Sequence, residues 1–384
     1  MGPSNAVMRR WNIRAPIRVL AHMCRVLVGL SILIAGFAPA QSSPHAPLLI
    51  RNVTIIDCAG HVPQSGMSVL ISAGRITSIT AASKVKMPAN TEVLDGHGKF
   101  LIPGLWNMHV HLGAYEDGKR ALAAYLAEGI TGIRDMGSPL DDILRLRSEV
   151  DHGTINGPHM AVAGPIVQGP LPFQMPMFIS VKDVATARQT VKMLKHRGVD
   201  FIKVQDAIPH DIYVALAAEA RNEHIPFVGH VPPTVLPEEA TDLGQRSIEH
   251  LGGRFWGLLI GSSDQESKLH ADEIEMYHDI LTALDHKEPP PSPNMHWTFT
   301  KAVVETYDSQ RAEKLISRFK RKGTWQCPTL VVLHTLWSDG ETQYSPEDHL
   351  WAQRLVSMET GLIAIMQKAG VGLLAGTDLP PDTE

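Results

Sequence analysis

Short runs in which apolar and polar residues alternate fill the segment 46–103. The clearest are LLIRNVTIIDCAG, SVLISAGRITSIT and TEVLDGHGKFLIPG, where Val, Ile and Thr alternate with polar residues and Gly, Asp or Asn separate the runs. A period of two bounded by turn residues is typical of half-buried β-strands. The pattern therefore predicts antiparallel strands of a small β-domain.

The pattern changes at Gly104, after which apolar runs alternate with amphipathic helical stretches. In VKDVATARQTVKMLKHRG, for example, Val184, Ala187 and Val191 share one helical face and Gly198 ends the helix. We expect eight strands, at 105–112, 129–136, 159–166, 200–206, 225–230, 246–251, 326–334 and 371–378. This alternation predicts an α/β fold built as a (β/α)8 TIM barrel. The alternative, an open doubly wound sheet, would carry a Gly-rich phosphate loop after an early strand, and the sequence has none there.

One connection in this predicted barrel is unusually long. About seventy residues, roughly 252–324, separate the sixth and seventh expected strands, and they include HKEPPPSPNMHW. Connections of this length form lids or pocket walls, or else contain helices of their own. We expect helices joined by a Pro-rich turn.

The first forty residues are typical of a secretory signal. Arginines without acidic residues precede the apolar stretch VLVGLSILIAGFA, and residues 38–40 form an A-x-A cleavage site. The apolar stretch is shorter than the roughly 20 residues that a spanning helix needs. We expect cleavage after Ala40, a periplasmic or secreted location and no stable membrane anchor afterwards. An uncleaved anchor is the alternative.

Composition and charge exclude some classes of function. Apolar residues make up 44% of the chain and charged residues 20%, as in ordinary globular proteins. The formal net charge of −5 is spread without long runs, so no nucleic-acid partner is expected. Cys24 falls in the expected signal segment, and Cys58 and Cys327 form no CxxC motif. We expect these two to be buried small hydrophobic residues, with a disulfide between them left open.

Polar residues stand at the ends of several expected strands, which is where a barrel keeps its active site. His109 and His111 end the first strand and point to the same side, because side chains alternate along a strand. The fourth, fifth, sixth and eighth strands carry Lys203, His230, His250 and Asp378. Imidazoles and a carboxylate suit a borderline divalent metal such as zinc. Each residue alone is also compatible with a polar strand end, an ion pair or a helix cap, but their joint placement favours a metal centre.

Lys203 requires a separate explanation, because an ammonium group has no lone pair for a metal. Its neighbours Phe201, Ile202 and Val204 would desolvate the amine and lower its pKa. A neutral amine in such a place can react with carbon dioxide to form a carbamate, an anionic ligand with two oxygens. The sequence permits this modification at Lys203.

Several segments together resemble a known superfamily. In order, LIPGLWNMHVHLG, GITGIRDMG, GVDFIKVQ, VGHVP, RSIEHL and LLAGTD are similar to the metal-dependent amidohydrolases, in particular the imidazolonepropionase-like and prolidase-like exported branch. The resemblance runs from about Ile50 to Asp378. It implies a (β/α)8 barrel with a small β-sandwich built from both chain ends. We therefore assign 1–40 to the signal peptide, 41–103 to the N-terminal part of the sandwich and 104–384 to the barrel.

The resemblance also implies a ligand set. Two divalent metal ions, expected to be Zn2+, would be bound at the rim. By motif position, His109 and His111 would hold the first metal together with Asp378, and His230 and His250 would hold the second. Carboxylated Lys203 would bridge the two metals.

The activity that follows is hydrolysis of an amide-type C–N bond in a small molecule: a dipeptide, an N-acyl amino acid or a cyclic amide. A metal-activated hydroxide would attack the carbonyl, with Asp378 as general base and then general acid. Arg134 and His334 are candidates for substrate binding, although an internal ion pair of Arg134 and a surface role of His334 are alternatives. The competing classes are a catalytically impaired homologue and a metal-binding barrel without turnover.

Only LPPDTE follows Asp378, whereas the superfamily continues with further helices and sandwich strands. We expect a C-terminally truncated fold, with a gap covered by another chain as the alternative. A small-molecule substrate is the expected partner, and a homo-oligomer is left open.

Overall fold

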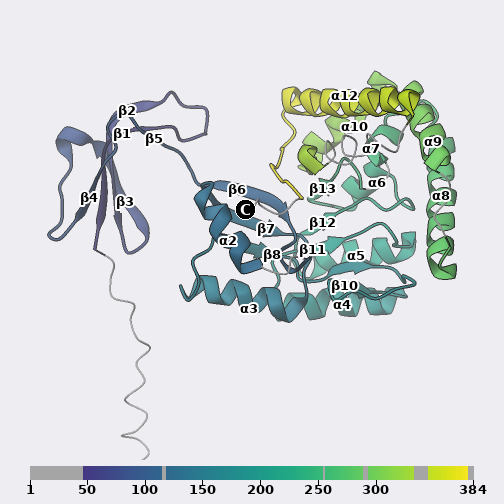
Figure 1. Ribbon diagram of the computed structural model, residues 1–384, viewed down its shortest axis with the longest axis horizontal. Coiled ribbons are helices and arrows are strands. Elements are labelled where there is room, and N and C mark those ends of the chain that lie inside the picture. The colour runs from purple at the N-terminus through teal and green to yellow at the C-terminus, as the bar shows by residue number, and fades with distance from the viewer. Residues whose placement is uncertain (1–45, 115–117, 254–255, 289–292, 333–344, 379–384) are drawn as a thin grey trace, which may run out of the picture. The chain divides into compact units, whose positions relative to one another are not determined.

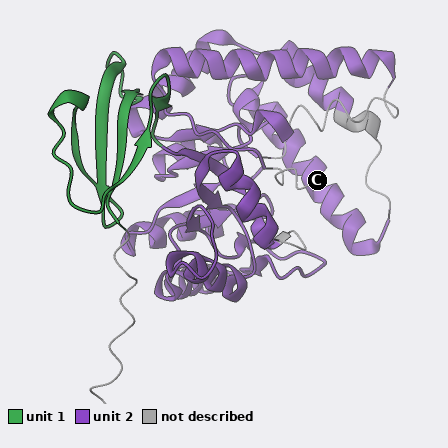
Figure 2. Ribbon diagram, turned by 60° about the vertical axis from the view of Figure 1, so that its left-hand side comes forward, with its two compact units in different colours: residues 1–103 green, residues 104–384 purple. Residues whose placement is uncertain are grey.

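The computed structural model describes residues 46–114, 118–253, 256–288, 293–332 and 345–378 (Figure 1). The expected signal peptide at 1–40 lies outside the described residues. The chain divides into two compact units, Met1–Pro103 and Gly104–Glu384 (Figure 2). Each unit is described by itself below.

The first unit contains one five-stranded sheet among its described residues. Its strands are β1 (Leu48–Ile55), β2 (Gln64–Ser72), β3 (Arg75–Ala81), β4 (Glu92–Asp95) and β5 (Phe100–Leu101), and the order is β3-β2-β1-β4 with β5 also paired to β1. The pairs β1–β2 and β2–β3 are antiparallel, as predicted. The prediction was wrong for β4 and β5, which run parallel to β1. Residues 82–91, with the short helix η2 (Ala82–Lys84), carry the chain across the sheet, so β4 enters in the same direction as β1.

Several apolar side chains of this sheet are buried, and others are exposed. Leu49, Val53 and Val69 are almost fully buried, whereas Val93 and Phe100 are exposed. Cys58 also lies at the surface, which corrects the expectation that it is buried; Cys327 is buried as expected, and both are free thiols.

The second unit contains two parallel sheets. The first is β6 (Leu105–Val110), β7 (Ile130–Asp135) and β8 (His159–Val162), in that order. The second has the order β10-β9-β11-β12-β13-β14, formed by β9 (Ile166–Gln168), β10 (Phe178–Ser180), β11 (Ile202–Val204), β12 (Phe227–Gly229), β13 (Ser247–Glu249) and β14 (Trp325–Cys327). The first seven predicted strands thus correspond to β6, β7, the pair β8 and β9, β11, β12, β13 and β14.

Two predicted strands differ from the structure. The expected strand 326–334 ends at Cys327, because Pro328 has no amide hydrogen to continue the ladder, and residues 330–332 are helical. The expected strand 371–378 forms only an isolated bridge between Leu373 and Gln326. Its backbone nevertheless bonds on both sides: Leu374 N donates to Gln326 O at 2.8 Å, and Met108 N donates to Ala375 O at 2.7 Å. This segment therefore lies between β14 and β6.

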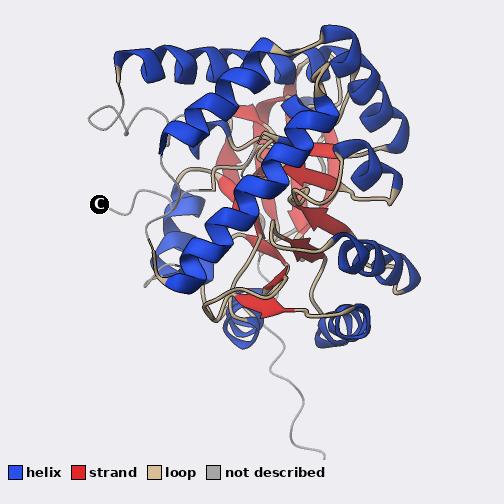
Figure 3. Ribbon diagram, turned by 90° about the vertical axis from the view of Figure 1, so that its right-hand side faces the viewer, coloured by secondary structure: helices blue, strands red, loops and turns tan. Residues whose placement is uncertain are grey.

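Helices lie around the strands of the second unit (Figure 3). They are α2 (Gly118–Ala127), α3 (Leu140–Asp151), α4 (Val184–Arg197), α5 (His210–Asn222), α6 (Pro237–Asp242), α7 (Gly257–Ile260), α8 (Glu266–His286), α9 (Pro293–Glu305), α10 (Ser309–Lys322) and α12 (Pro346–Ala369), with a short helix η3 (Leu112–Ala114) after β6. The α4 prediction is confirmed: Asp183 caps its start, and Gly198 ends it with a φ of 86°. No helix within the described ranges is long and apolar enough to cross a membrane.

The long connection after β13 contains four of these helices, α7 to α10, as the sequence analysis expected. Buried side chains of this connection, such as Leu258, Leu269 and Phe319, join the same hydrophobic core as Val204 and Ile248 of the strands. Close packing on both faces of the sheet explains why its strands are almost wholly apolar, and why polar residues on them are informative.

Candidate metal centre

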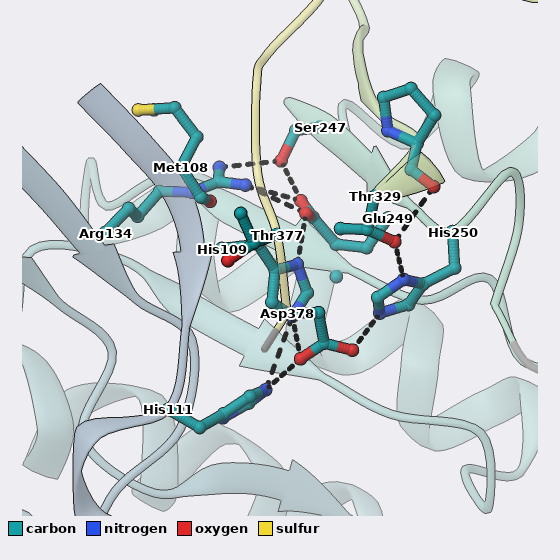
Figure 4. Close-up of polar contacts among 12 residues, drawn as sticks. Met108, His109, His111, Arg134, Ser247, Glu249, His250, Thr329, Thr377 and Asp378 are labelled. Carbon is teal, nitrogen blue, oxygen red and sulfur yellow. Dashed lines mark hydrogen bonds and ion pairs between the residues drawn. The ribbon is translucent and has the colours of Figure 1, made fainter. Parts of the chain in front are cut away.

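Three candidate ligands converge where β6 meets the last described segment. Nε2 of His109 lies 3.3 Å from Nε2 of His111. Oδ1 of Asp378 lies 3.5 Å from the first nitrogen and 3.3 Å from the second (Figure 4). His109 is fully buried, and the other two are partly buried. These three side chains form a group with metal-binding geometry among the described residues.

The spacing of these atoms fits a bound cation. Tetrahedral zinc ligands at 2.0–2.1 Å from the metal are separated by roughly 3.3 Å from one another. Without a cation, two imidazole lone pairs and a carboxylate oxygen would face each other at this distance and repel. The donor set thus fits a divalent metal, and the fit rests on His109, His111 and Asp378.

Each of the four histidines uses its Nδ1 for a hydrogen bond to the protein. The partners are Glu249 Oε2 for His109 (2.9 Å), Gly137 O for His111 (3.0 Å), Asp206 Oδ1 for His230 (2.6 Å) and Thr329 Oγ1 for His250 (2.5 Å). A carbonyl or carboxylate oxygen can only accept a hydrogen bond, which fixes Nδ1 as the N–H in His109, His111 and His230. The hydroxyl of Thr329 donates to Pro328 O and therefore accepts from Nδ1 of His250. Nε2 is then left with its lone pair, the arrangement typical of metal-binding histidines.

Burial keeps three of these rings neutral. Desolvation lowers the pKa of His109, His230 and His250, and His109 and His250 fall well below the usual value. The nearby charge of Lys203 lowers all three pKa values further, against the opposing effect of acidic neighbours. Neutral rings have the free lone pair that a metal requires.

Asp378 connects the first three ligands to a second group. Its Oδ2 lies 3.7 Å from Nε2 of His250. The ring of His250 lies 4.6 Å from that of His109 and 5.0 Å from that of His230, measured between centroids. His230 and His250 therefore lie side by side next to the first group, as the predicted second ligand pair requires.

The carboxylate of Asp378 is held in its ionised form. Burial by itself would raise the pKa of Asp378, but the contact with His111 and the nearby positive charge of Lys203 outweigh burial and lower the pKa. An anionic Asp378 is both a better metal ligand and a proton acceptor.

Lys203 lies on β11 beside these groups and is 1% exposed. Desolvation lowers its pKa, despite the attraction of Glu249, Asp378 and Asp206. Within the described part of the chain, its Nζ makes no hydrogen bond or ion pair. Gly229 leaves the space for this side chain, because a Cβ there would lie 2.9 Å from Lys203 Cδ.

Arg134 does not reach toward a substrate in the way we expected. Its Nε donates to Met108 O at 2.6 Å, Nη1 donates to Ser247 Oγ at 3.0 Å and Nη2 donates to both oxygens of Glu249 at 2.8 and 2.9 Å. These donors are used inside the unit, which favours the alternative of an internal ion pair over substrate binding. His334, the other candidate, lies outside the described residues.

A second group of potential ligands, His109, Glu249 and Cys327, is better explained by hydrogen bonding. His109 and Glu249 are already bonded to each other. Burial raises the pKa of Cys327 far above its usual value, and nearby Glu249 raises it further. The thiol therefore stays protonated and is not a metal ligand, which requires the thiolate.

The backbone at this centre adopts unusual conformations. His250, Thr329 and Asp378 have φ values of 52°, 48° and 54°. Residues with side chains adopt this left-handed region rarely, and it is concentrated at functional sites. Gly376 allows the last segment to approach, because a Cβ there would lie 2.7 Å from both Cys327 Sγ and His109 Cβ.

The sequence analysis did not identify the groups that orient the histidines. Asp206 at the end of β11 and Glu249 on β13 are both almost fully buried acids. A charged residue inside an otherwise apolar strand was a signal for Glu249, and Asp206 follows Lys203 within the same predicted strand. Thr329 and the carbonyl of Gly137 had no signal in the sequence.

Comparisons with known proteins give short sequence matches and longer structural ones. No family model matches the chain. Among curated proteins, a deacetylase of Agrobacterium fabrum is 30% identical over 102 residues, 26% of this chain and 25% of that protein. An N-acetylglucosamine-6-phosphate deacetylase of Lysinibacillus sphaericus is 36% identical over 70 residues, 18% of this chain and 17% of that protein. The matched segments thus span a quarter or less of each relative's length.

Solved structures match much more of the chain. Bottromycin amidohydrolase aligns with a TM-score of 0.62 at 19% identity, over 88% of this chain and 70% of that protein. A prolidase in complex with N-methylphosphonate-L-proline aligns with a TM-score of 0.60 at 18% identity, over 88% of this chain and 80% of that protein. At these identities the structures establish the fold. With the deacetylase relatives, they confirm the resemblance to the amidohydrolase superfamily.

Proposed function

We propose that this chain, sharing the fold of the amidohydrolase superfamily, is a metal-dependent hydrolase that cleaves an amide-type C–N bond in a small molecule. The observation that carries the proposal is the convergence of His109 Nε2, His111 Nε2 and Asp378 Oδ1 within 3.5 Å of one another. The names of the relatives, which are deacetylases, a prolidase and an amidohydrolase, support the reaction class.

The proposal includes two metal sites, which the arrangement of the side chains supports. His109, His111 and Asp378 would hold one cation, and His230 and His250 would hold the other. A carbamate on Lys203 would bridge them, since its amine is buried, has a lowered pKa and makes no hydrogen bond or ion pair to a described residue. Imidazole and carboxylate ligands favour Zn2+ among the common divalent ions.

Bound cations of this kind polarise a carbonyl and lower the pKa of water. The chain's own contribution centres on Asp378, which is ionised at neutral pH. It accepts a proton from the attacking water as the new C–O bond forms. It then donates that proton to the leaving nitrogen as the C–N bond breaks. Glu249 and Asp206 hold His109 and His230 in the required orientation.

We also propose that the second unit is a closed (β/α)8 barrel. Backbone bonds support closure on two sides: residues 372–378 bond to both β14 and β6, and Asp200 N donates to Val162 O between β8 and β11 at 2.9 Å. The first unit is then proposed as part of a β-sandwich, and the N-terminal forty residues as an export signal.

The substrate class is proposed as dipeptides, N-acyl amino acids or cyclic amides. The test is metal analysis of the purified protein, followed by assays with one panel from each of these three classes. Bound metal with turnover supports the proposal. Metal without turnover would instead indicate a non-catalytic metal-binding barrel, and protein that takes up no metal after exposure to Zn2+ would contradict the proposed centre.

A matched pair of variants makes this test specific. His109→Asn removes a buried candidate ligand, whereas His152→Asn changes an exposed histidine that contacts Ser148. We expect the first variant to lose most bound metal and the second to bind metal as the unmodified protein does.

A further inference from the structure

A sizeable cavity lies where β9 ends and the following loop returns to β10. Its volume is about 580 Å³, and residues 168–180 supply its walls. That volume is several times the roughly 150 Å³ of a cavity that holds benzene, and it falls within the range of small-molecule sites. Parallel barrel strands present their functional residues at this carboxyl end.

The walls of the cavity are uncharged and combine large apolar side chains with the polar Gln168, Gln174 and Ser180. Leu171, Phe173, Met175 and Ile179 are among the apolar side chains that line the cavity, and none of the described residues that line it carries a charge. Phe173 and Met175 are 43% and 44% exposed, although both are large and apolar. A charged ligand group would be desolvated here without a partner, whereas an apolar group would be stabilised.

Gln168 is the buried polar group of this cavity, with 4% exposure. Its Oε1 accepts a hydrogen bond from Ala207 N at 2.8 Å. A backbone N–H requires an acceptor, so this bond fixes which end of the side-chain amide is oxygen. Nε2 is left with two donor hydrogens, and no described residue accepts from it.

The cavity is connected to the candidate metal centre through short contacts. Gly169 packs so closely on Ala207 that a Cβ would overlap the Ala207 carbonyl oxygen. The neighbouring Asp206 bonds His230 at 2.6 Å. At the other end of β9, Ile166 packs against Gly137, whose carbonyl accepts from His111. β9 and the following Gly169 therefore contact Gly137, which bonds His111, and Ala207, the chain neighbour of the Asp206 that bonds His230.

We propose that this cavity, called here the β9 pocket, binds a bulky apolar side group of the amide substrate. Nε2 of Gln168 donates a hydrogen bond to a carbonyl or carboxylate oxygen of the same substrate. This inference rests on the proposed hydrolase function and narrows its substrate class: amides that carry an aromatic or branched aliphatic group are preferred over small or charged ones.

The first experiment measures kcat/KM of the metal-loaded protein with two substrate series. N-acetyl-X varies the side chain on the amine side of the scissile bond, and X-Gly dipeptides vary it on the acyl side, with X as Gly, Leu, Phe, Lys or Glu. We expect Phe or Leu to exceed Gly at least tenfold in one series, with Lys and Glu at or below Gly. Equal rates for all X, or a preference for Lys or Glu, would overturn the inference.

A pair of tryptophan substitutions tests the location. Met175→Trp fills the β9 pocket, whereas Met193→Trp changes a partly exposed methionine on α4. We expect Met175→Trp to lower kcat/KM at least tenfold for the Phe or Leu substrate and to lower it at least fivefold less for the Gly substrate. Met193→Trp should change neither. An equal loss of kcat/KM for both substrates in Met175→Trp would contradict the proposal that this pocket binds the substrate's apolar side group.

The variant Gln168→Glu tests the hydrogen bond that Nε2 of Gln168 is proposed to donate to the substrate. A glutamate keeps an acceptor for Ala207 N and so preserves the internal bond, but it removes the two donor hydrogens. We expect KM for the preferred substrate to rise at least tenfold with kcat within twofold, and the thermal midpoint to fall because the new carboxylate is desolvated. If Gln168 had a purely structural role, KM would be unchanged in Gln168→Glu. That result would contradict the proposal that Gln168 donates a hydrogen bond to the substrate.

Binding without catalysis separates this inference from the proposed function. Calorimetry on metal-depleted protein compares N-acetylphenylalanine with N-acetylglycine. If N-acetylphenylalanine binds more tightly but the metal-loaded protein hydrolyses no substrate, the β9 pocket is supported and the proposed hydrolase function is rejected. Turnover with no apolar preference in either measurement would reject the β9 pocket alone.

Discussion

Glu249 Oε2 lies 2.9 Å from Nδ1 of His109, and both side chains are fully buried. The same carboxylate accepts two hydrogen bonds from Arg134 Nη2. Burial would raise the pKa of Glu249, but the charges of Arg134 and Lys203 outweigh burial and lower it. A single buried anion thus orients a candidate metal ligand and neutralises a buried cation.

Replacement of this anion is expected to affect both metal binding and folding. Glu249→Gln should weaken metal affinity about 10- to 100-fold, because His109 loses the partner that fixes its orientation. It should also lower the free energy of unfolding by about 3–5 kcal/mol, because Arg134 is left buried without a counter-charge. Zinc titration and urea denaturation measure the two effects. The double variant with Arg134→Met should recover part of the stability but none of the affinity, and unchanged affinity in the single variant would refute the assigned role.

Asp378→Asn tests the proton transfer. Asparagine has nearly the same shape but neither accepts the proton nor offers an anionic ligand, so we expect kcat to fall by at least about 100-fold. Steady-state kinetics at saturating zinc separate this loss from weaker metal binding. Activity within threefold of the unmodified protein would exclude Asp378 as the base.

Lys203→Ala tests the carbamate. We expect loss of the second metal and of nearly all activity, with partial rescue by acetate or propionate, because a small carboxylate can occupy the vacated space and bridge the cations. Native mass spectrometry of the unmodified protein should show one added carbon dioxide that disappears after acid denaturation. Full metal content in Lys203→Ala without added carboxylate would argue against a bridging role.

Gly376→Ala should disturb the centre through packing alone. The added methyl group would lie 2.7 Å from Cys327 Sγ and 3.0 Å from His109 N, closer than atoms tolerate. We expect a thermal midpoint several degrees lower and weaker metal binding. Gly361→Ala is the matched control: it lies within α12 with no atom within 4 Å of the new methyl, and alanine favours a helix. It should leave metal binding unchanged and slightly raise stability.

Glu359 should make stability depend on pH. Burial raises its pKa to about 8, and it lies on the buried face of α12 with no ion pair or hydrogen bond to any described residue. In the unfolded state Glu359 loses its proton from about pH 4.5, whereas in the folded state it keeps the proton up to about pH 8. The free energy of unfolding therefore decreases progressively as the pH rises from 4.5 toward 8.

Glu359→Gln removes that cost. Its free energy of unfolding should match the unmodified protein near pH 5 and exceed it by up to about 4 kcal/mol at pH 8 and above. Urea denaturation from pH 5 to 9 measures the difference, with Glu275→Gln at an exposed position of α8 as the control. A difference that does not change with pH would show that Glu359 is ionised in the folded protein.

Much of this centre could be predicted from the order of polar residues along the chain. Strand ends carry His109, His111, His230 and His250, and parallel strands bring their carboxyl ends to one rim. The alternating pattern also located β1, β2 and β3. Such signals are local, since they depend on which side of one strand a residue faces.

What could not be predicted depends on distant contacts. The partner of Arg134 is Glu249, 115 residues away, and Thr329 meets His250 across 79 residues. Periodicity carries no information on such pairs. The parallel direction of β4 likewise depends on where the crossing segment leads, and strand 326–334 is shortened by Pro328, which removes one backbone donor.

Asn107 Nδ2 donates to Thr377 Oγ1 at 2.8 Å across 270 positions of the chain, and Asp378 N donates to His109 O beside it. A partly folded molecule can already display the His-x-His pair but has no acid beside it until this longest loop has closed. A tightly bound metal ion would then be found only in the fully folded protein. Metal binding would stabilise this native state relative to partly folded intermediates.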